Sequence, residues 1–274
     1  VFIITGSLSR ATVTPSIAEN DGPMGAAAIA RALSVGFNAI PVVISDEAII
    51  GKLAMMLEVA GCNVMSFDEA RAATDTPRFT QVASTATIPS DPTHAAAHCA
   101  ALIEKYQPAC VVTIERAGMT ADGTYRNALG QDYSEGRAHL DYLIDVAAER
   151  GTPTVGIGDG GNELGMGAVQ AAVHEFVPHG PILCAERATD VLLPAGVSNW
   201  GGYAIAAALA ISQNNPDLAH SVERERRMLE AAPGIGLIDG STGRLDPTAD
   251  GMPLAVHLSI VELLCQAVRS SAKA

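Results

Sequence analysis

Short apolar runs alternate along the chain with longer segments that are Ala-rich, amphipathic or charged. The apolar runs predict buried strands at 1–5, 39–44, 63–67, 109–114, 153–157, 190–193 and 235–238. The longer segments predict helices at 24–33, 45–60, 93–106, 134–150, 165–174, 199–212, 217–231 and 253–269. Two polar stretches, 7–20 and 75–92, are expected to be loops.

The repeated order of strand and helix is typical of a parallel sheet whose crossovers are helical. We therefore expect an α/β fold with three layers, in which a doubly wound, mostly parallel sheet carries helices on both faces. No linker or internal repeat divides the sequence, so residues 1–274 are expected to form one domain. Because the chain opens directly in a strand, we also expect that residues precede Val1 in the full protein.

Chemically distinctive residues follow several of the predicted strands. They are Gly6 and Ser7 after the first strand, Glu115 and Arg116 after another, Gly158 and Asp159 after a third, and the segment 195–200 after a fourth. Ligands of open α/β sheets bind in the crevice outside the carboxyl ends of the strands. These four loops are therefore expected to meet at one site.

Composition and charge exclude some classes of function. Hydrophobic residues make up 48% of the chain and aromatic residues 4%, which suits parallel strands covered by Ala-rich helices. The net charge of −13 argues against nucleic acids and anionic membranes, which both require a basic surface. The five cysteines are widely spaced and form no CxxC pair, so we expect reduced thiols and a cytoplasmic protein.

The most unusual stretch is 156–167, in which six of twelve residues are Gly and the only charges are Asp159 and Glu163. It lacks the Lys and Ser/Thr of a P-loop, and its GxGxxG match lacks the acidic strand end that dinucleotide sites carry. The two carboxylates suit acid/base chemistry or a hard cation. The alternative is structural: Asp159 would form an Asx turn and Glu163 would cap the next helix.

Other segments add candidate groups. Arg116 and Arg126 could each hold a substrate carboxylate in a bidentate fork, although Glu115 and Arg116 could equally form a surface ion pair. Asp21 is either a helix cap or a site group. Asp239 and Asp250, each before a Gly, are interpreted as turn residues.

Several of these motifs resemble the D-glutamate cyclase family, specifically its C-terminal cyclase-like domain. The resemblance rests on segments 20–26, 113–118, 122–127, 156–167 and 196–201, and it extends over essentially the whole chain. It implies a hydro-lyase that cyclises D-glutamate to 5-oxo-D-proline with loss of water.

That reaction requires a base for the amine and a means of activating the γ-carboxyl group. Our hypothesis makes Glu115 or Asp159 the base, Glu163 the acid or a metal ligand, and Arg116 and Arg126 the carboxylate holders. The full set of expected substrate-binding residues is Gly6, Ser7, Asp21, Arg116, Asp122, Arg126, Asn127, Gly160, Gly161, Asn162, Ser198 and Asn199.

The sequence leaves other functions open. No cofactor is assigned, but Asp21, Asp159 and Glu163 would suit Mg²⁺ or Mn²⁺, and with such an ion the chain would be a hydrolase or phosphatase of a small metabolite. A small-molecule binding protein without catalysis is the remaining alternative. As partners we expect a small amino acid, no nucleic acid and no membrane, with a homodimer as a compatible assembly.

Overall fold

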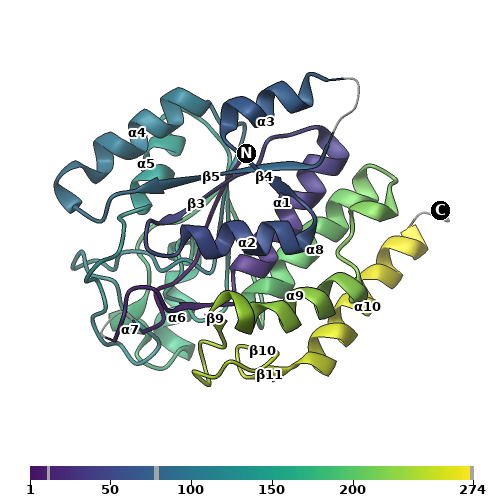
Figure 1. Ribbon diagram of the computed structural model, residues 1–274. Helices are drawn as coiled ribbons and strands as arrows, with labels where there is room; N and C mark the ends of the chain where they lie inside the picture. Colours follow the sequence, from purple (N-terminus) through teal and green to yellow (C-terminus); the bar gives the residue numbers. More distant parts are fainter. Residues whose placement is uncertain (11–12, 77–79, 272–274) are drawn as a thin grey trace.

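The computed structural model describes residues 1–10, 13–76 and 80–271 of the chain. Its centre is a seven-stranded sheet in the order β4-β5-β3-β1-β6-β7-β8, in which every neighbouring pair is parallel (Figure 1). The strands are β1 (Phe2–Thr5), β3 (Val42–Asp46), β4 (Asn63–Val64), β5 (Val82–Ile88), β6 (Val111–Ile114), β7 (Thr154–Gly158) and β8 (Val191–Pro194). The expected doubly wound, three-layer α/β fold is confirmed.

Helices cover both faces of this sheet because successive strand residues point to opposite sides. In β1, Phe2 and Ile4 pack into the core beneath one helix layer, whereas Ile3 packs into the core beneath the other. The first layer contains α3 (Phe67–Thr74), α4 (Ala95–Tyr106) and α5 (Asp141–Glu149), and the second contains α1 (Pro23–Phe37), α2 (Ile50–Ala60) and α8 (Ser198–Ser212). Outside the second layer lie α9 (Val222–Ile235) and α10 (Leu254–Ser271).

Smaller elements complete the chain at the end of the sheet where the strands finish. Two short helices, α6 (Gln170–Phe176) and α7 (Gly180–Leu183), follow the loop after β7. Two small sheets pair β2 (Ala18–Glu19) with β9 (Leu237–Ile238) and β10 (Thr248–Ala249) with β11 (Met252–Pro253).

Strand β1 lies between β3 and β6, and this is where the order of the sheet reverses. The chain builds the β3 side first and then returns past β1 to add β6, β7 and β8. The loops after β1 and β6 therefore diverge to opposite faces. They leave between them the crevice in which doubly wound folds bind ligands.

The prediction of a loop at 75–92 is wrong for the central part of that segment. Residues 82–88 form β5, a central strand paired with β3 on one side and β4 on the other. Its sequence, VASTATI, is rich in Ser and Thr, and we interpreted these hydroxyls as loop markers. Thr is β-branched and fits a strand well, and Ser84 is buried in the sheet. Residues 11–12 and 77–79 of the two expected loops lie outside the described part of the chain.

Several expected boundaries also move. The predicted strand 63–67 ends at Val64, and Ser66 and Glu69 form a capping box that begins α3. Residues 45–46 belong to β3, so α2 begins at Ile50. Helix α5 begins at Asp141 rather than at 134, and α9 begins at Val222 behind Ser221, its N-cap, rather than at 217.

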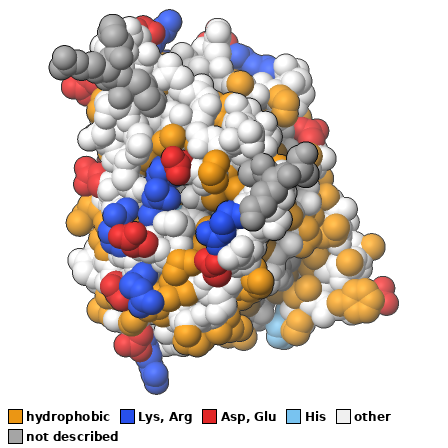
Figure 2. Space-filling view, turned by 90° about the vertical axis from the view of Figure 1, so that its right-hand side faces the viewer, with side chains coloured by type: hydrophobic (Ala, Val, Ile, Leu, Met, Phe, Trp, Pro, Cys, Tyr) orange, Lys and Arg blue, Asp and Glu red, His pale blue; other side chains and the backbone are white. Residues whose placement is uncertain are grey.

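The surface mixes charges of both signs. Figure 2 shows one face, on which Lys and Arg side chains lie beside Asp and Glu side chains, with apolar groups between them. Among the described helices, none combines the length and apolar character that crossing a bilayer would require.

Candidate active site

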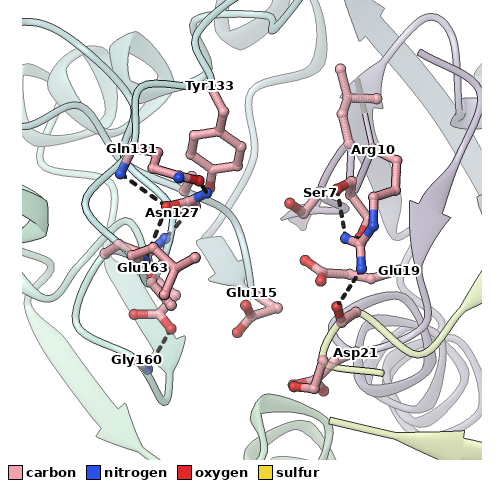
Figure 3. Close-up of a pocket in the computed structure, with 18 of the residues that line it drawn as sticks. Ser7, Arg10, Glu19, Asp21, Glu115, Asn127, Gln131, Tyr133, Gly160 and Glu163 are labelled. Atoms are coloured by element: carbon pink, nitrogen blue, oxygen red, sulfur yellow. Dashed lines mark hydrogen bonds between the residues drawn. The ribbon is translucent and has the colours of Figure 1, made fainter. Parts of the chain in front are cut away.

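A cavity of about 960 Å³ opens above the carboxyl ends of β1, β6 and β7. It is lined by Ser7 after β1, Glu115 after β6 and Asp159 after β7. Further wall residues come from the loops at 127–135 and 240–250. Figure 3 shows Ser7, Arg10, Glu19 and Asp21 on one side of the cavity, with Asn127, Gln131, Tyr133, Gly160 and Glu163 on the other and Glu115 between them.

The N-terminus of α8 gathers three carboxyl groups at the floor of this cavity. The backbone N–H of Ser198 donates to Asp21 Oδ2 at 3.1 Å and to Asp159 Oδ2 at 2.9 Å. The N–H of Asn199 donates to Asp21 Oδ1 at 2.8 Å, and the Ser198 hydroxyl donates to Glu115 Oε2 at 2.6 Å. The free N–H groups and the positive end of the helix dipole both favour carboxylates at this position.

Close packing of two helices fixes where the α8 N-terminus lies. The Asn199 side chain accepts hydrogen bonds from the N–H groups of Gly22 and Gly25 at the start of α1, at 3.0 and 2.7 Å. A Cβ on Gly202 would lie 2.6 Å from the Cα of Gly25, so neither helix could approach so closely with a larger residue. The SNWGG segment thus combines carboxylate binding with helix packing.

Glu115 is held in an unusual backbone conformation. Its φ is 44°, in the left-handed region that a non-glycine residue rarely adopts. The adjacent Gly22 is needed for this placement, because a Cβ there would lie 2.7 Å from the Cβ of Glu115. Strain of this kind is retained where the surrounding structure enforces it, and it concentrates at functional sites.

Glu163 organises the glycine-rich loop after β7. Its carboxylate accepts hydrogen bonds from the backbone N–H groups of Asp159 at 3.1 Å, Gly160 at 2.6 Å and Gly161 at 2.7 Å. Gly161 takes a φ of 97°, a left-handed conformation that glycine adopts readily in a tight turn. Glu163 therefore shapes the turn that presents Asp159, while still lining the cavity.

Burial and mutual repulsion raise the pKa values of four carboxyl groups in the cavity. Burial raises the pKa of Asp159 to about 10, with further contributions from the charges of Asp21 and Glu163. Burial also raises the pKa of Asp21 and of Glu19 to about 7. The pKa of Glu115 is raised well above its ordinary value by burial and by the charge of Asp159. Protonated and ionised carboxyls thus coexist here near neutral pH.

The same cluster has the donors of a hard-cation site. One oxygen each from Asp21, Glu115 and Asp159 lies within 4.8 Å of the other two. Mg²⁺ and Mn²⁺ prefer carboxylate oxygens, and metal–oxygen distances of about 2.0–2.2 Å would bridge such a set after a small closure. The carboxyl groups therefore fit either shared protons or a divalent cation.

The loop 239–251 forms the outer wall and is built around Asp239. This buried carboxylate accepts hydrogen bonds from the N–H groups of Ser241 at 2.9 Å and Thr242 at 2.9 Å, and from the Thr248 hydroxyl at 2.6 Å. Asp239 is thus a turn residue, as expected. Asp250 adopts the turn conformation expected of it, with φ at 48°, but its side chain also lines the cavity.

The structure brings together many of the residues expected at the site. Those that line the cavity are Ser7, Asp21, Glu115, Asn127, Asp159, Gly160, Asn162 and Glu163. Ser198 and Asn199 contact the cluster through their hydrogen bonds, and Gly161 supports it through Glu163.

The two arginines expected to hold a substrate carboxylate lie elsewhere. Arg116 is 1% exposed, and its guanidinium donates to Asp46, to the Gly6 carbonyl at 3.0 Å and to the Ala138 carbonyl at 2.7 Å. Arg116 and Gly6 thus support the floor and do not line the cavity. Arg126 forms an ion pair with Asp122 at 2.9 Å, and neither side chain lines the cavity.

Sequence reasoning missed Arg10, Glu19, Gln131, Tyr133 and most of the 240–250 wall. Glu19 belongs to a two-residue strand, β2, whose partner β9 is more than 200 residues away in the chain. Gln131 and Tyr133 lie just before the predicted helix 134–150, in a segment to which no site residue was assigned. The length of the 7–20 loop was the signal that pointed toward Arg10 and Glu19, since long loops in compact folds tend to be functional.

Comparison with known proteins shows the family to which the chain is similar. The family described as "D-glutamate cyclase-like, C-terminal" matches residues 1–265. The human protein named "D-glutamate cyclase, mitochondrial" is 47% identical over 103 residues, a stretch that covers 37% of this chain and 17% of the human protein.

Proposed function

The chain belongs to the family of D-glutamate cyclase-like C-terminal domains, and from that premise we propose that it is a hydro-lyase that converts D-glutamate to 5-oxo-D-proline and water. The observation that carries the proposal is the group of three carboxyls, Asp21, Glu115 and Asp159, gathered on the α8 N-terminus. This arrangement offers both a proton donor and a proton acceptor at neutral pH.

The chemistry requires both. The α-ammonium group must lose a proton before its nitrogen can attack, and the γ-carboxylate must gain protons before an oxygen can leave as water. A pair of carboxyls with separated pKa values supplies these roles within one site.

Asp159 is the acid in this proposal, because its pKa of about 10 keeps it protonated at pH 7. Asp21 is the base, since its pKa of about 7 leaves it partly ionised at that pH. Glu115, strained and bonded to Ser198, positions the γ-carboxyl group with its own proton. These roles refine the sequence hypothesis, in which Glu115 or Asp159 was the base.

The proton transfers of this mechanism balance. Asp21 takes one proton from the ammonium group, and Asp159 gives one to the γ-carboxylate. The nitrogen attacks the carbon of the γ-carboxyl group, the new C–N bond forms as the C=O double bond opens, and the nitrogen passes its second proton to Asp159. Asp21 then returns its proton to the departing hydroxyl, so water leaves and both carboxyls regain their starting states.

The cavity also reduces the entropic part of the barrier. Asn127, Gln131 and Tyr133 face the acidic cluster across the cavity and offer donors and acceptors to a folded glutamate chain (Figure 3). Holding the amine close to the carbon of the γ-carboxyl group places the two reacting atoms in a near-attack geometry, which is a recognised source of rate acceleration.

A divalent cation is the specific alternative that the geometry favours. Asp21, Glu115 and Asp159 would hold Mg²⁺ or Mn²⁺, and such an ion would supply Lewis-acid polarisation of a carboxyl or phosphoryl oxygen. In that case a metal-dependent hydrolase acting on a small metabolite is the second candidate function.

The test is direct. The purified protein is incubated with D-glutamate or L-glutamate, with EDTA or with added Mg²⁺ or Mn²⁺, and 5-oxoproline is quantified by chiral chromatography. We expect 5-oxo-D-proline from the D-enantiomer in the EDTA sample. Formation of no 5-oxoproline from either enantiomer under any condition would contradict the proposal. Release of phosphate from phosphorylated metabolites only when a metal is added would favour the second candidate.

A further inference from the structure

The charged residues that line the cavity are almost all acidic. Of its lining residues in the described part of the chain, Arg10 is the sole basic one, with no Lys or His beside it. Eight carboxylic residues share the lining: Glu19, Asp21, Glu115, Asp132, Glu135, Asp159, Glu163 and Asp250. Such a field attracts an ammonium group and repels a carboxylate, so an amino-acid substrate needs a cation at one defined point.

The Arg10 guanidinium is anchored on one side. Its Nη1 donates to the Ser9 carbonyl at 2.8 Å and to the Ser9 hydroxyl at 2.7 Å, and its Nη2 donates to the Gly240 carbonyl at 3.2 Å. All these acceptors are neutral. Within the described residues, no carboxylate forms an ion pair with Arg10, although eight line the same cavity.

The remaining donors of Arg10 match a carboxylate. A guanidinium carries five N–H groups, and the three contacts above leave the Nε–H and a second Nη2–H without an acceptor among the described residues. Nε and Nη2 lie next to each other on one edge of the planar group. Two N–H groups on one edge form the fork that binds a carboxylate with two parallel hydrogen bonds.

We propose that Arg10 binds the α-carboxylate of the substrate and thereby sets the specificity of the site for α-amino acids. This inference rests on the proposed cyclase function. The γ-carboxyl group must accept protons and so belongs at Asp21, Glu115 and Asp159, whereas the α-carboxylate stays ionised throughout. Figure 3 shows Arg10 on the wall of the cavity, above Glu19 and Asp21. This placement assigns the two carboxyl groups of a glutamate molecule to different points of the cavity.

Ligands with and without the α-carboxylate provide the test. 5-Oxo-D-proline retains this group, and 2-pyrrolidinone is the same ring without it. In the same way, 4-aminobutanoate is glutamate without its α-carboxylate. Binding of the two lactams is measured by isothermal titration calorimetry, and ring closure of the two amino acids by chromatography. The proteins are the unmodified chain, Arg10→Met, Arg10→Lys and the remote Arg150→Met.

We expect Arg10→Met to weaken 5-oxo-D-proline binding and to lower kcat/KM for D-glutamate by about 10- to 100-fold, mainly through KM, as expected for loss of charged hydrogen bonds. Binding of 2-pyrrolidinone and the slow closure of 4-aminobutanoate should stay within about twofold. Arg10→Lys keeps the charge without the fork and should fall between the two. Arg150→Met, which removes an exposed ion pair with Glu104, should match the unmodified protein in every measurement.

The outcomes separate the two proposals. If the unmodified protein neither cyclises D-glutamate nor binds 5-oxo-D-proline, the cyclase function fails, and the role of Arg10 fails with it. If the unmodified protein does both and Arg10→Met does so equally well, the function stands and the Arg10 assignment is overturned. A parallel loss for 2-pyrrolidinone and 4-aminobutanoate would show that Arg10 only supports the loop, and would also overturn the assignment.

Discussion

At the scale of single residues, Glu115 and Asp159 have the clearest roles to test. Each accepts a hydrogen bond from Ser198, one from its hydroxyl and one from its backbone N–H. Substitution by the matching amide keeps an acceptor oxygen in place, but it removes the proton that Asp159 transfers and the carboxylic O–H with which Glu115 positions the γ-carboxyl group. We therefore expect Asp159→Asn to lower kcat for 5-oxo-D-proline formation at least about a hundredfold, the usual scale for losing a catalytic acid, and Glu115→Gln to lower it by a smaller factor through loss of positioning.

The control for these variants is Glu104→Gln, an exposed helix carboxylate that contacts Arg150. All three proteins should show the circular dichroism of the unmodified chain. Near-normal turnover in both site variants, with folding intact, would remove Glu115 and Asp159 from the mechanism.

The sequence predicted some of these residues and not others for physical reasons. Glu115 and Asp159 were found because a carboxylate just after a parallel strand must point near the crevice. Arg116 occupies the same kind of position after β6, yet Asp46 at the end of β3, on the far side of β1, draws its side chain into the floor. That pairing depends on strand order, which the sequence does not contain. Arg10 and Glu19 depend on long-range contacts with residues 237–240.

At the scale of elements, the contact between α1 and α8 is the most sensitive part of the site. A Cβ on Gly202 would meet the Gly25 backbone, its Cα at 2.6 Å and its carbonyl oxygen at 2.8 Å. Backbone atoms cannot move aside as a flexible side chain can, so the helices would have to separate. We expect Gly202→Ala to lower the free energy of unfolding by about 1–3 kcal/mol, the usual cost of overpacking.

The same substitution should impair activity beyond its effect on stability, because Ser198 and Asn199 begin this helix. The matched control is Gly51→Ala in α2, where an added Cβ meets nothing within 4 Å. That variant should be as stable as the original or about 0.5–1 kcal/mol more stable, since alanine favours helix and restricts the unfolded chain. Urea denaturation of both variants measures the difference, and equal stabilities would show that the two helices can separate without cost.

Elements whose pattern is local were predicted best. The Ala-rich segments that became α4 and α8 begin within two residues of their expected starts, and the apolar strands β1, β6 and β7 are placed correctly. Strand β5 was missed because its hydroxyl-rich sequence is stabilised by two neighbouring strands. Helix α5 begins late because residues just before it are held by the floor: the Ala138 N–H donates to Asp46 Oδ1 at 2.6 Å. In each case a tertiary contact overrides the local preference.

At the scale of the whole molecule, the fold places its acidic groups where they cost stability. The sheet reverses its order at β1, and the crevice formed there is lined by eight carboxylic residues. A protein of net charge −13 gains nothing in stability from gathering carboxyls in a half-buried cavity. We therefore infer that function requires the carboxyls where the strand order reverses, and that their presence there lowers stability.

The cost in stability depends on pH. The pKa of Asp159 is raised to about 10 and those of Asp21 and Glu19 to about 7, whereas in the unfolded chain carboxyls titrate near pH 4. Between these limits the folded state binds more protons than the unfolded state, so the free energy of unfolding falls as pH rises from about 4 toward 10. The melting temperature in EDTA should therefore fall from pH 5.5 to pH 9.

Asp159→Asn removes one of these carboxyls, so its melting temperature should fall less than that of the unmodified protein between pH 5.5 and pH 9. The two falls should differ by at least roughly 2–4 °C, the shift that accompanies about 1 kcal/mol in a chain of this size. Asp190→Asn is the control of opposite sign, because hydrogen bonds from Thr154 lower the pKa of that exposed carboxyl, and its variant should be less stable than the original at neutral pH.

Differential scanning calorimetry measures the melting temperatures of all three proteins. A melting temperature of the unmodified protein that is level or rising from pH 5.5 to 9 would show that the cluster is ionised throughout and would remove the proton donor from the mechanism. If Mg²⁺ abolishes the alkaline loss in the unmodified protein but not in Asp159→Asn, the cluster binds the cation through that carboxylate.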